Sequence, residues 1–377
     1  MRVLYFHRDD GVHDRRFLDA LGDLPVEVFA LQLENRVKLL PEWKPAANVH
    51  KICWSGSDDK FRWRQKTRMI SELKQIYQDH QPDVIHAGPV DLCAYLAACA
   101  GIKPLVSISW GYDLLFNVEK SQASQMRARF ALENTAVLLD DCQAVSQKAG
   151  QYGFPSERLV TFPWGVDLQV YHPQEGKHTG FIPANRERVV FLSTRQMEKQ
   201  YGCDVIIKAF LKAAMIEDNL YLIMLGEGSQ KRHLMQQSSE AGLDGKVKFA
   251  GCVPESEMIT YFHASDVYIS ASHSDGSSVS LLQAMACGLS SIVSDIPGNR
   301  EWVTEGKSGW LFKDGDSDQL SALMIDAARR PELRGSLGAA ARIIATERAD
   351  WQQNYPKLLD AYRMAIDFQA GKGLNAC

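Results

Sequence analysis

Short apolar runs alternate with longer helical stretches along the whole chain, and the alternation starts again after residue 188. The runs are rich in Val, Ile and Leu rather than alternately apolar and polar, as expected of strands that are covered on both faces. Repeats of strand, helix and strand predict parallel sheets in doubly wound α/β domains. The predicted strands are Val3–Phe6, Val26–Leu33, Asp83–His86, Leu105–Ile108 and Cys142–Val145 in the first half, and Val189–Ser193, Tyr221–Leu225, Lys246–Phe249, Val267–Ser270 and Ser291–Ser294 in the second.

The 377 residues of the chain are enough for two such domains. The polar segment Tyr171–Arg186 contains two Pro and two Gly and has neither a helical nor a strand period, so it is the predicted linker. We expect an N-terminal domain over residues 1–170, the linker over 171–186, a C-terminal domain over 187–350 and a closing helical segment over 351–377. In the first half the predicted helices are Val12–Leu21, Arg62–Gln78 and Leu92–Ala100.

The composition excludes several classes of function. The 42 Lys and Arg against 46 Asp and Glu give a net charge of −4, whereas a dedicated nucleic-acid-binding domain is usually strongly basic. The N-terminus turns charged too early for a secretory signal, and no stretch approaches the roughly 18 apolar residues of a membrane span, so we expect a cytoplasmic protein. The eight cysteines form no C-x-x-C pair, which favours reduced thiols and gives no support to a metal site. The nucleophile elbow G-x-S-x-G and the P-loop are absent.

In doubly wound folds, ligands bind at the carboxyl ends of the strands, and the window Ser270–Phe312 offers the richest set of residues at such a position. A strand ends near Ser270, a loop carries Asp275 and Gly276, and a helix begins near Ser277 or Ser278. The N-terminus of that helix presents unpaired N–H groups and a favourable dipole to a phosphate. Asp275 beside it could orient sugar hydroxyls or balance positive charge on an anomeric carbon. The alternative is that Asp275 shapes an Asp-Gly turn and caps the helix.

Two cations follow a second predicted strand. Arg195 comes shortly after Val189–Ser193, and Lys199 lies four residues further on. A planar guanidinium and a compact ammonium together suit a diphosphate leaving group, although a solvated basic loop would have the same sequence. Gly226, Gly251 and Val253 also lie at or beyond the ends of strands, where glycine lets the backbone approach a flat ligand.

The first half offers fewer candidates. His86 ends a strand, Trp110 and Asp113 follow another, and Gly11 precedes a helix. A lone His at a strand end is more often structural than catalytic, so both interpretations of His86 stay open.

A basic and aromatic segment, residues 60–77, contains Lys60, Arg62, Arg64, Lys66 and Arg68 together with Phe61 and Trp63. It could lie against an anionic membrane surface. It could equally be a solvated helix face whose long side-chain stems cover apolar surface.

The order of these windows resembles the retaining, GT-B-fold glycosyltransferases of the family 4 type. The family signature has an acidic residue and Gly, then Glu-Ala-Met-Ala-x-Gly on a helix, then Gly-x-x-Glu. Here these positions are Asp275-Gly276, Gln283-Ala284-Met285-Ala286-Cys287-Gly288 and Gly298-Asn299-Arg300-Glu301, and Pro163–Asp167 is similar to the family's motif at the domain joint. The resemblance implies two Rossmann-like domains that face a central cleft, and a C-terminal helix over 351–377, around Trp351 and Tyr362, that crosses back onto the N-terminal domain.

The resemblance also implies roles for the candidate residues. Arg195 and Lys199 would bind the nucleotide diphosphate, Asp275 would contact the donor sugar, and Gln283 would meet the ribose. The loop and helix start at Gly276, Ser277, Ser278 and Val279 would hold phosphate, beside Gly226, Gly251 and Val253. Asp275, Arg195, Lys199 and His86 are therefore the catalytic candidates, and Gly11, Trp110 and Asp113 belong to the acceptor side.

Three positions depart from the family pattern. Gln283 replaces the second Glu, which removes a charge-assisted hydrogen bond to the ribose. Lys199 has an unusual spacing from Arg195, and Trp110 stands where many members carry His.

We therefore expect a retaining hexosyltransferase that moves a sugar from a nucleotide-diphosphate sugar, a UDP-sugar, to a hydroxyl of a glycan, a lipid-linked or a small-molecule acceptor. No metal or other cofactor is expected, since Arg195 and the helix dipole supply the charge stabilisation. A nucleotide-sugar-binding regulatory protein with weak activity and a nucleotide-sugar epimerase are the alternatives. Expected partners are the nucleotide sugar and the acceptor, with no nucleic acid, and peripheral contact of residues 60–77 with the inner face of the membrane.

Overall fold

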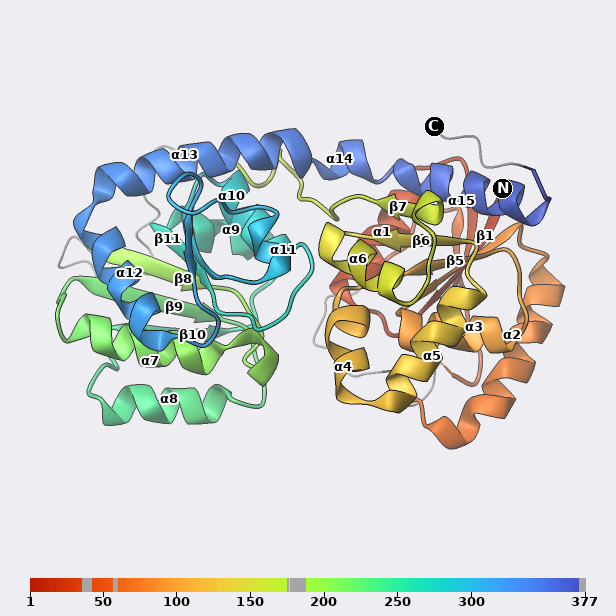
Figure 1. Cartoon of the computed structure of the whole chain (residues 1–377), viewed down its shortest axis with the longest axis horizontal. Helices are drawn as coiled ribbons and strands as arrows, with labels where there is room; N and C mark the ends of the chain where they lie inside the picture. The colour runs from red at the N-terminus through yellow and green to blue at the C-terminus, as the bar shows by residue number, and fades with distance from the viewer. Residues whose placement is uncertain (36–42, 57–59, 175, 177–187, 373–377) are drawn as a thin grey trace. The chain divides into compact units, whose positions relative to one another are not determined.

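The computed structural model describes residues 1–35, 43–56, 60–174, 176 and 188–372, and the chain divides into two compact units (Figure 1). Unit 1 comprises Met1–Phe162 and Gln353–Cys377, and unit 2 comprises Pro163–Gln352. The division thus lies before the predicted boundary at residue 170, and the closing segment joins unit 1 from residue 353 rather than 351. Most of the predicted linker, at 175 and 177–186, lies outside the described residues.

Unit 1 is built on a seven-stranded sheet in the order β3-β2-β1-β4-β5-β6-β7, and all its strand pairs are parallel. Its strands are β1 (Arg2–His7), β2 (Glu27–Gln32), β3 (Val49–Ile52), β4 (Val84–Gly88), β5 (Leu105–Ile108), β6 (Val137–Asp140) and β7 (Leu159–Thr161). Its helices and short helical turns are α1 (Val12–Gly22), η1 (Trp63–Gln65), α2 (Lys66–His80), η2 (Val90–Ala94), α3 (Tyr95–Cys99), η3 (Asp113–Asn117), α4 (Val118–Lys120), α5 (Gln122–Glu133), α6 (Gln143–Gln151), η4 (Ser156–Arg158) and α15 (Lys357–Gln369). Four of the five strands predicted in the first half are confirmed as β1, β2, β4 and β5.

The fifth prediction, a strand at Cys142–Val145, is wrong. Cys142 is the residue before α6, and the strand lies earlier, at β6. Ala144, Val145 and Ala149 are buried on one face of that helix. A short apolar run does not distinguish a buried strand from the first turn of a helix, and the run Cys142–Val145 is compatible with both.

The closing segment is two helices instead of one. α14 (Trp351–Asn354) and α15 are separated at Pro356, which lacks an N–H group and restricts the residue before it. α15 packs against β4, β5 and β6 and buries Tyr362 completely. This packing joins the end of the chain to unit 1.

Unit 2 is built on a six-stranded sheet in the order β10-β9-β8-β11-β12-β13, again with parallel pairs. Its strands are β8 (Val189–Ser193), β9 (Leu220–Leu225), β10 (Val247–Gly251), β11 (Val267–Ser270), β12 (Ser290–Ser294) and β13 (Trp310–Phe312). Its helices and turns are η6 (Lys199–Tyr201), α7 (Cys203–Ala214), α8 (Lys231–Glu240), α9 (Glu255–His263), α10 (Val279–Ala286), α11 (Pro297–Arg300), α12 (Ser317–Arg329) and α13 (Pro331–Arg348). All five strands predicted in this half are confirmed, and β13 is an addition.

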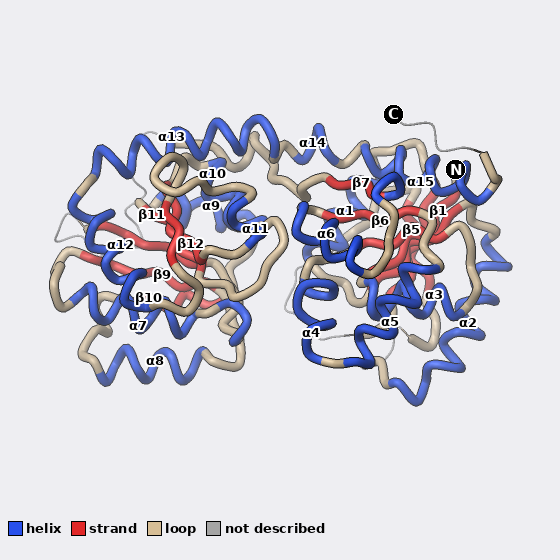
Figure 2. Tube along the Cα trace, viewed as in Figure 1, coloured by secondary structure: helices blue, strands red, loops and turns tan. Residues whose placement is uncertain are grey.

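Helices cover both faces of each sheet (Figure 2). In β8, Phe191 packs in one core cluster with residues of α7 and α12, while Val190 and Leu192 pack in another with residues of α10 and α13. Both units are therefore doubly wound, and the predicted fold class of two Rossmann-like domains is confirmed. The winding direction switches between β1 and β4 in unit 1 and between β8 and β11 in unit 2. Over the part of the chain that is described, no helix has the length and apolar character to cross a membrane.

Candidate active site

Two loops at the switch point of unit 2 bring predicted site residues into contact. Arg195 follows β8 and Asp275 follows β11, and these strands are neighbours in the sheet. The Arg195 guanidinium donates through Nη2 to the Asp275 carboxylate at 2.6 Å and through Nη1 to the Ser278 hydroxyl at 2.8 Å. Arg195 and Asp275 are 80 positions apart in the sequence, and they meet because the carboxyl ends of adjacent parallel strands share one edge of the sheet.

Ser278 is also the residue that precedes α10. Leu281, Leu282 and Met285 bury one side of this helix against the core. The Ser278 hydroxyl makes no capping hydrogen bond to the helix and accepts one from Arg195 instead. The first N–H groups of α10 have no partner within the helix, so the helix start and the guanidinium offer donors for an anion at one place.

Three further residues surround Arg195. Ser280 accepts a second hydrogen bond from Nη1 at 3.3 Å, and its hydroxyl lies 2.8 Å from that of Tyr268. The ring of Tyr201 lies 4.3 Å from the Arg195 guanidinium carbon, in a cation–π contact. Sequence reasoning missed these residues. One sequence feature pointed to Tyr201: it lies in the loop after Arg195, where the spacing of Lys199 departs from the family pattern.

The Arg195–Asp275 pair is largely shielded from solvent, with side-chain exposures of 12% and 20%. Partial burial raises the pKa of Asp275 above its usual value, although the Arg195 charge opposes that rise. Desolvation lowers the pKa of the Arg195 guanidinium, but the Asp275 charge, together with neighbouring groups, outweighs it and holds this pKa well above its ordinary value, so the side chain stays charged. Its Nε is buried and has no hydrogen-bond partner among the described residues.

Glycines allow the loops around Arg195 to pack closely. Gly226 has φ +111°, and a Cβ on it would lie 2.8 Å from the Arg195 carbonyl oxygen. Its N–H group donates to the carbonyl of Gly251 at 2.7 Å, which joins the loop after β9 to the end of β10. The two glycines therefore lie beside the Arg195 loop, as expected of residues that border the same site.

The other donor-side candidates line α10 and the loops around it. Ser277 and Gly276 are buried, and the Ser277 hydroxyl accepts a hydrogen bond from Trp302 Nε1 at 3.0 Å. Val253, Val279 and Gln283 are half-buried. Ser277 therefore anchors the loop, while Val279 and Gln283 keep part of their surface accessible.

Lys199 is not part of the Arg195 cluster. It begins the short turn η6 and is exposed, and its ammonium forms no hydrogen bond or ion pair with any residue that the structure describes. Gln200 and Tyr201 lengthen the loop before Gly202, and Tyr201 takes the place next to the guanidinium. The predicted diphosphate contact of Lys199 stays a prediction.

Two candidates of unit 1 lie in its interior. His86 is 1% exposed, its Nδ1 lies 2.7 Å from the Tyr362 hydroxyl, and burial lowers its pKa to about 3. Asp113 is fully buried and accepts hydrogen bonds from the Val90 N–H and the Ser109 hydroxyl, both at 2.7 Å. Burial raises the pKa of Asp113 to about 7. This geometry favours the structural interpretation of His86, while a catalytic role of His86 and an acceptor contact of Asp113 stay predictions.

Gly11 and Trp110 lie at the carboxyl edge of the unit 1 sheet. Gly11 precedes α1 in extended conformation. Trp110 follows β5, is half-buried, stacks on His13 at a ring distance of 5.9 Å and meets Phe17 edge-on at 5.4 Å. An aromatic ring that is partly accessible at this edge suits a sugar or alcohol acceptor, and its role stays a prediction.

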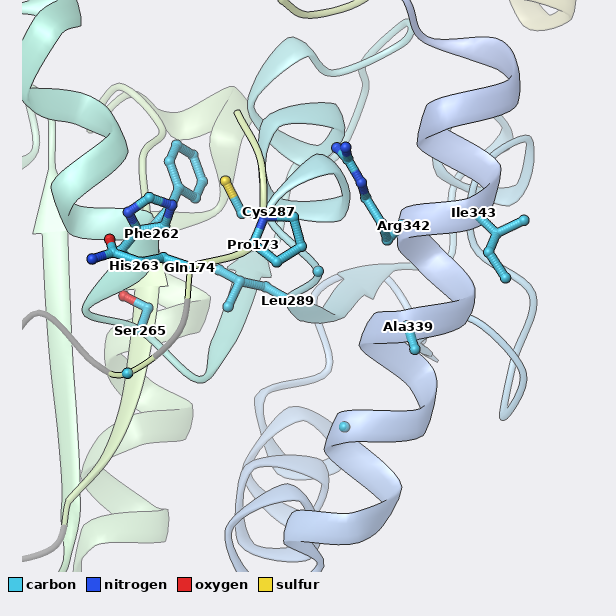
Figure 3. Close-up of a pocket in the computed structure, with 13 residues that line it drawn as sticks. Pro173, Gln174, Phe262, His263, Ser265, Cys287, Leu289, Ala339, Arg342 and Ile343 are labelled. Atoms are coloured by element: carbon cyan, nitrogen blue, oxygen red, sulfur yellow. The ribbon is translucent and has the colours of Figure 1, made fainter. Parts of the chain in front are cut away.

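A cavity of about 690 Å³ opens elsewhere in unit 2 (Figure 3). Phe262 and His263 of α9, Cys287 after α10, and Arg342 of α13 contribute to its lining. The Arg342 guanidinium already donates to the carbonyls of Tyr171 and Ala286. The cavity lies at the C-terminal end of α10, about 12 Å along the helix from Ser278, and contains none of the predicted site residues, so it is separate from the Arg195 cluster. No group of three His, Cys, Asp or Glu among the described residues is placed to hold a metal ion.

Comparison with known proteins agrees with this fold. Two family profiles match, "Glycosyl transferases group 1" over residues 177–344 and "Glycosyl transferase 4-like" over residues 2–141. The D-inositol 3-phosphate glycosyltransferase of an Arthrobacter species is 24% identical, over 92% of this chain and 87% of its own length. The GDP-mannose-dependent alpha-(1-6)-phosphatidylinositol monomannoside mannosyltransferase of Mycolicibacterium smegmatis is 23% identical, over 78% of this chain and 79% of its own length.

Solved structures share the fold. Anabaena Alr3699/HepE in complex with UDP has a TM-score of 0.77 at 17% identity, over 96% of this chain and 100% of that one. Sucrose-phosphate synthase from Thermosynechococcus elongatus has a TM-score of 0.80 at 15% identity, over 99% of this chain and 100% of that one. The matching profiles, the relatives and the shared fold together define a two-domain glycosyltransferase that uses a nucleotide-sugar donor. The chain belongs to the GT-B glycosyltransferases of the family 4 type, since the two profiles and the structural neighbours agree on it.

Proposed function

We propose that the protein transfers a hexosyl group from a UDP-sugar to a hydroxyl acceptor with retention of the anomeric configuration. The observation that carries the proposal is the contact of Arg195 with both Asp275 and Ser278 at the start of α10. A fixed cation, a helix N-terminus and a carboxylate lie around one point there. These groups suit the phosphates and the sugar of a nucleotide-diphosphate sugar.

Arg195 would stabilise the leaving diphosphate. Its Nη1 now donates to the neutral hydroxyls of Ser278 and Ser280, and phosphate oxygens would replace them because charge-assisted hydrogen bonds are stronger. Its Nη2 would stay with Asp275, which keeps the guanidinium in place. Together with the free amides of α10 it opposes the negative charge that develops on the departing group. We therefore expect transfer without a metal or another cofactor, and a rate that a chelator leaves unchanged.

The reaction balances without another reactant. The bond between the anomeric carbon and the diphosphate oxygen breaks, and a bond to the acceptor oxygen forms on the same face of the sugar. The acceptor proton passes to the diphosphate oxygen. Asp275 would face the sugar and balance the positive charge on its anomeric carbon. We assign donor binding to the second half of the chain, with an added contact from Lys199, and acceptor binding to the first half, at Gly11 and Trp110.

A panel of UDP- and GDP-sugars with glycan, lipid-linked and small alcohol acceptors tests the proposal. The panel needs both bases, since the Anabaena structure holds UDP and the Mycolicibacterium relative is named for GDP-mannose. We expect transfer from a UDP-sugar, and proton NMR of the product should show the anomeric configuration of the donor. An inverted product would refute retention. Interconversion of the donor sugar without an acceptor would instead identify an epimerase.

A binding or regulatory protein of the same fold is the second candidate, and Gln283 is the residue that favours it. Gln283 lies on α10, half-buried, where the family pattern has Glu. A neutral amide still accepts and donates hydrogen bonds to ribose hydroxyls but lacks the charge-assisted bond. Tight donor binding with no transfer to any acceptor would favour this candidate.

A further inference from the structure

Three elements of unit 1 bring large apolar side chains together at one surface, and two of them expose these side chains to solvent. Trp63 of η1 is 47% exposed, and Met126 and Phe130 of α5 are 71% and 40% exposed. α3 packs between α2 and α5 and contributes Tyr95 (Figure 1). We call these four side chains, with the neighbouring Arg62, Arg64, Lys66, Arg127 and Arg129, the aromatic–cationic surface.

The aromatic rings of this surface form a continuous row. Phe61 meets Trp63 edge-on at 5.1 Å, Trp63 meets Tyr95 at 6.2 Å, and Tyr95 meets Phe130 at 5.8 Å. Met126 lies one helical turn before Phe130 on α5. Segments that are distant in the sequence therefore build one apolar strip.

Cations surround the strip. The Arg127 guanidinium carbon lies 4.4 Å from the Trp63 ring, and Lys66 Nζ lies 4.6 Å from the Tyr95 ring. Arg62, Arg64 and Arg129 are exposed and form no ion pair with any described residue. Residues 60–77 carry six Lys or Arg and one acidic residue, Glu72, which pairs with Arg68 at 2.7 Å. This local excess of positive charge contrasts with the net charge of −4 of the chain.

We propose that the aromatic–cationic surface binds the face of an anionic lipid bilayer. Exposed Trp, Phe and Met side chains gain from burial at the boundary of headgroups and acyl chains, and Lys and Arg gain from anionic headgroups. A purely solvated helix face would need the long cationic stems but not this row of rings, in which Trp63 and Phe130 are exposed and Phe61 and Tyr95 are half-buried. The structure thus favours the membrane interpretation of residues 60–77 and adds α3 and α5 to it. The inference is independent of the donor chemistry.

The surface also connects to the carboxyl edge of its sheet. Arg127 Nε donates to the Asp91 carbonyl oxygen, in the turn η2 after β4, at 3.1 Å. β4 is one of the two strands at the switch point of unit 1. Contact with a bilayer would therefore act directly on the loop that borders the expected acceptor side.

Vesicle flotation tests the proposal with the full-length protein. We expect it to float with mixed phosphatidylcholine–phosphatidylglycerol vesicles and to stay behind with pure phosphatidylcholine vesicles. The double variant Arg62→Gln/Arg64→Gln should lower the partition coefficient between vesicles and water about 30-fold, because the contributions of two surface cations to membrane binding are lost together. Met126→Ser should lower it about fivefold, because it removes an exposed apolar group without disturbing the core.

Matched controls come from unit 2. Arg232→Gln with Lys307→Gln removes the same charge from exposed positions, and Met215→Ser removes an 87% exposed Met. Both should leave flotation unchanged, and all variants should keep the melting temperature of the parent. If these controls lost flotation as strongly as the variants of the aromatic–cationic surface, binding would not depend on that surface, and the proposal would be overturned. Absence of flotation, or binding to a single-stranded oligonucleotide that vesicles do not displace, would overturn it too.

Discussion

Gly298 lies directly against the backbone of Asp275. A Cβ on Gly298 would stand 2.5 Å from the Asp275 carbonyl oxygen and 2.6 Å from that of Gly276, closer than side-chain carbons approach backbone oxygens in proteins. Gly298 belongs to α11, which follows β12, so the third motif of the family pattern supports the loop that carries the first. The position of the Asp275 carboxylate next to Arg195 therefore depends on a residue that contributes no side chain.

Gly298→Ala should displace this loop and lower activity. Because the obstructing atoms are backbone oxygens, we expect a loss of unfolding free energy of about 1–3 kcal/mol, typical of overpacking, together with a lower kcat/KM. Gly335→Ala is the matched control, since nothing lies within 4 Å of the added Cβ and the residue is in α13. That control should be stabilised by about 0.5–1 kcal/mol. Normal kinetics in Gly298→Ala would show that the loop does not need the contact.

Arg195→Ala should remove about 2–4 kcal/mol of transition-state stabilisation, the loss that follows removal of one preorganised donor. This loss corresponds to a kcat/KM that is roughly 30- to 1,000-fold lower. Steady-state kinetics with the best donor of the panel measure it. Lys208→Ala serves as control, because Lys208 pairs with Asp204 on the exposed side of α7. Kinetics near those of the parent in Arg195→Ala would remove Arg195 from the mechanism.

Gln283→Glu should strengthen donor binding modestly. A carboxylate forms charge-assisted hydrogen bonds with ribose hydroxyls that are about 1 kcal/mol better than those of the amide, so the donor KM should fall about fivefold while kcat changes little. Kinetics of donor saturation at a fixed acceptor concentration decide this. A large rise of kcat from a nearly inactive parent would instead support the regulatory protein as the natural state.

His86 should make the stability of unit 1 fall as the pH is lowered. Burial lowers its pKa to about 3 in the folded chain, against about 6.5 in the unfolded chain. Below pH 6.5 the unfolded chain takes up a proton that folded His86 refuses, so the stabilisation present above that pH is lost as the pH falls towards 3. Between pH 7 and pH 5 this amounts to about 2 kcal/mol.

Denaturant unfolding of the parent and of His86→Gln at both pH values measures the effect. Gln can keep a hydrogen bond to Tyr362 but does not titrate. Buried Asp113, whose pKa is raised to about 7, acts in the opposite direction and is common to both proteins, so the difference isolates His86. Parallel pH profiles for the two proteins would contradict the assignment.

The sequence predicted the fold well wherever an apolar run was long and isolated. The strands at the centres of both sheets are largely apolar: β4, β8 and β11 are fully buried and β1 is buried from Val3 to His7, so their pattern is strong. The missed edge strands β3, β7 and β13 have four residues or fewer, and β3 and β7 are only partly buried. The pattern also misses β6, a buried four-residue strand, because it predicts a strand at the later apolar run Cys142–Val145 instead. Short edge strands carry too little apolar pattern to be separated from loops.

The site was predictable to the extent that topology determines it. Residues that follow neighbouring parallel strands must meet, which brought Arg195 to Asp275 and Ser278. The sequence contains no comparable rule for side-chain direction. Asp113 therefore points into the interior, Lys199 points to solvent, and Tyr201 packs on the guanidinium, none of which the spacing of these residues predicted.

Calorimetric titration with UDP and with uridine, on the parent and on Arg195→Ala, tests most directly whether a diphosphate group binds between Arg195 and the start of α10. We predict that the variant binds UDP about 10- to 100-fold more weakly, the value of one lost hydrogen bond to a charged group, and binds uridine as the parent does. Uridine binding also shows that the variant is folded. Equal UDP affinity in the two proteins would contradict the central claim.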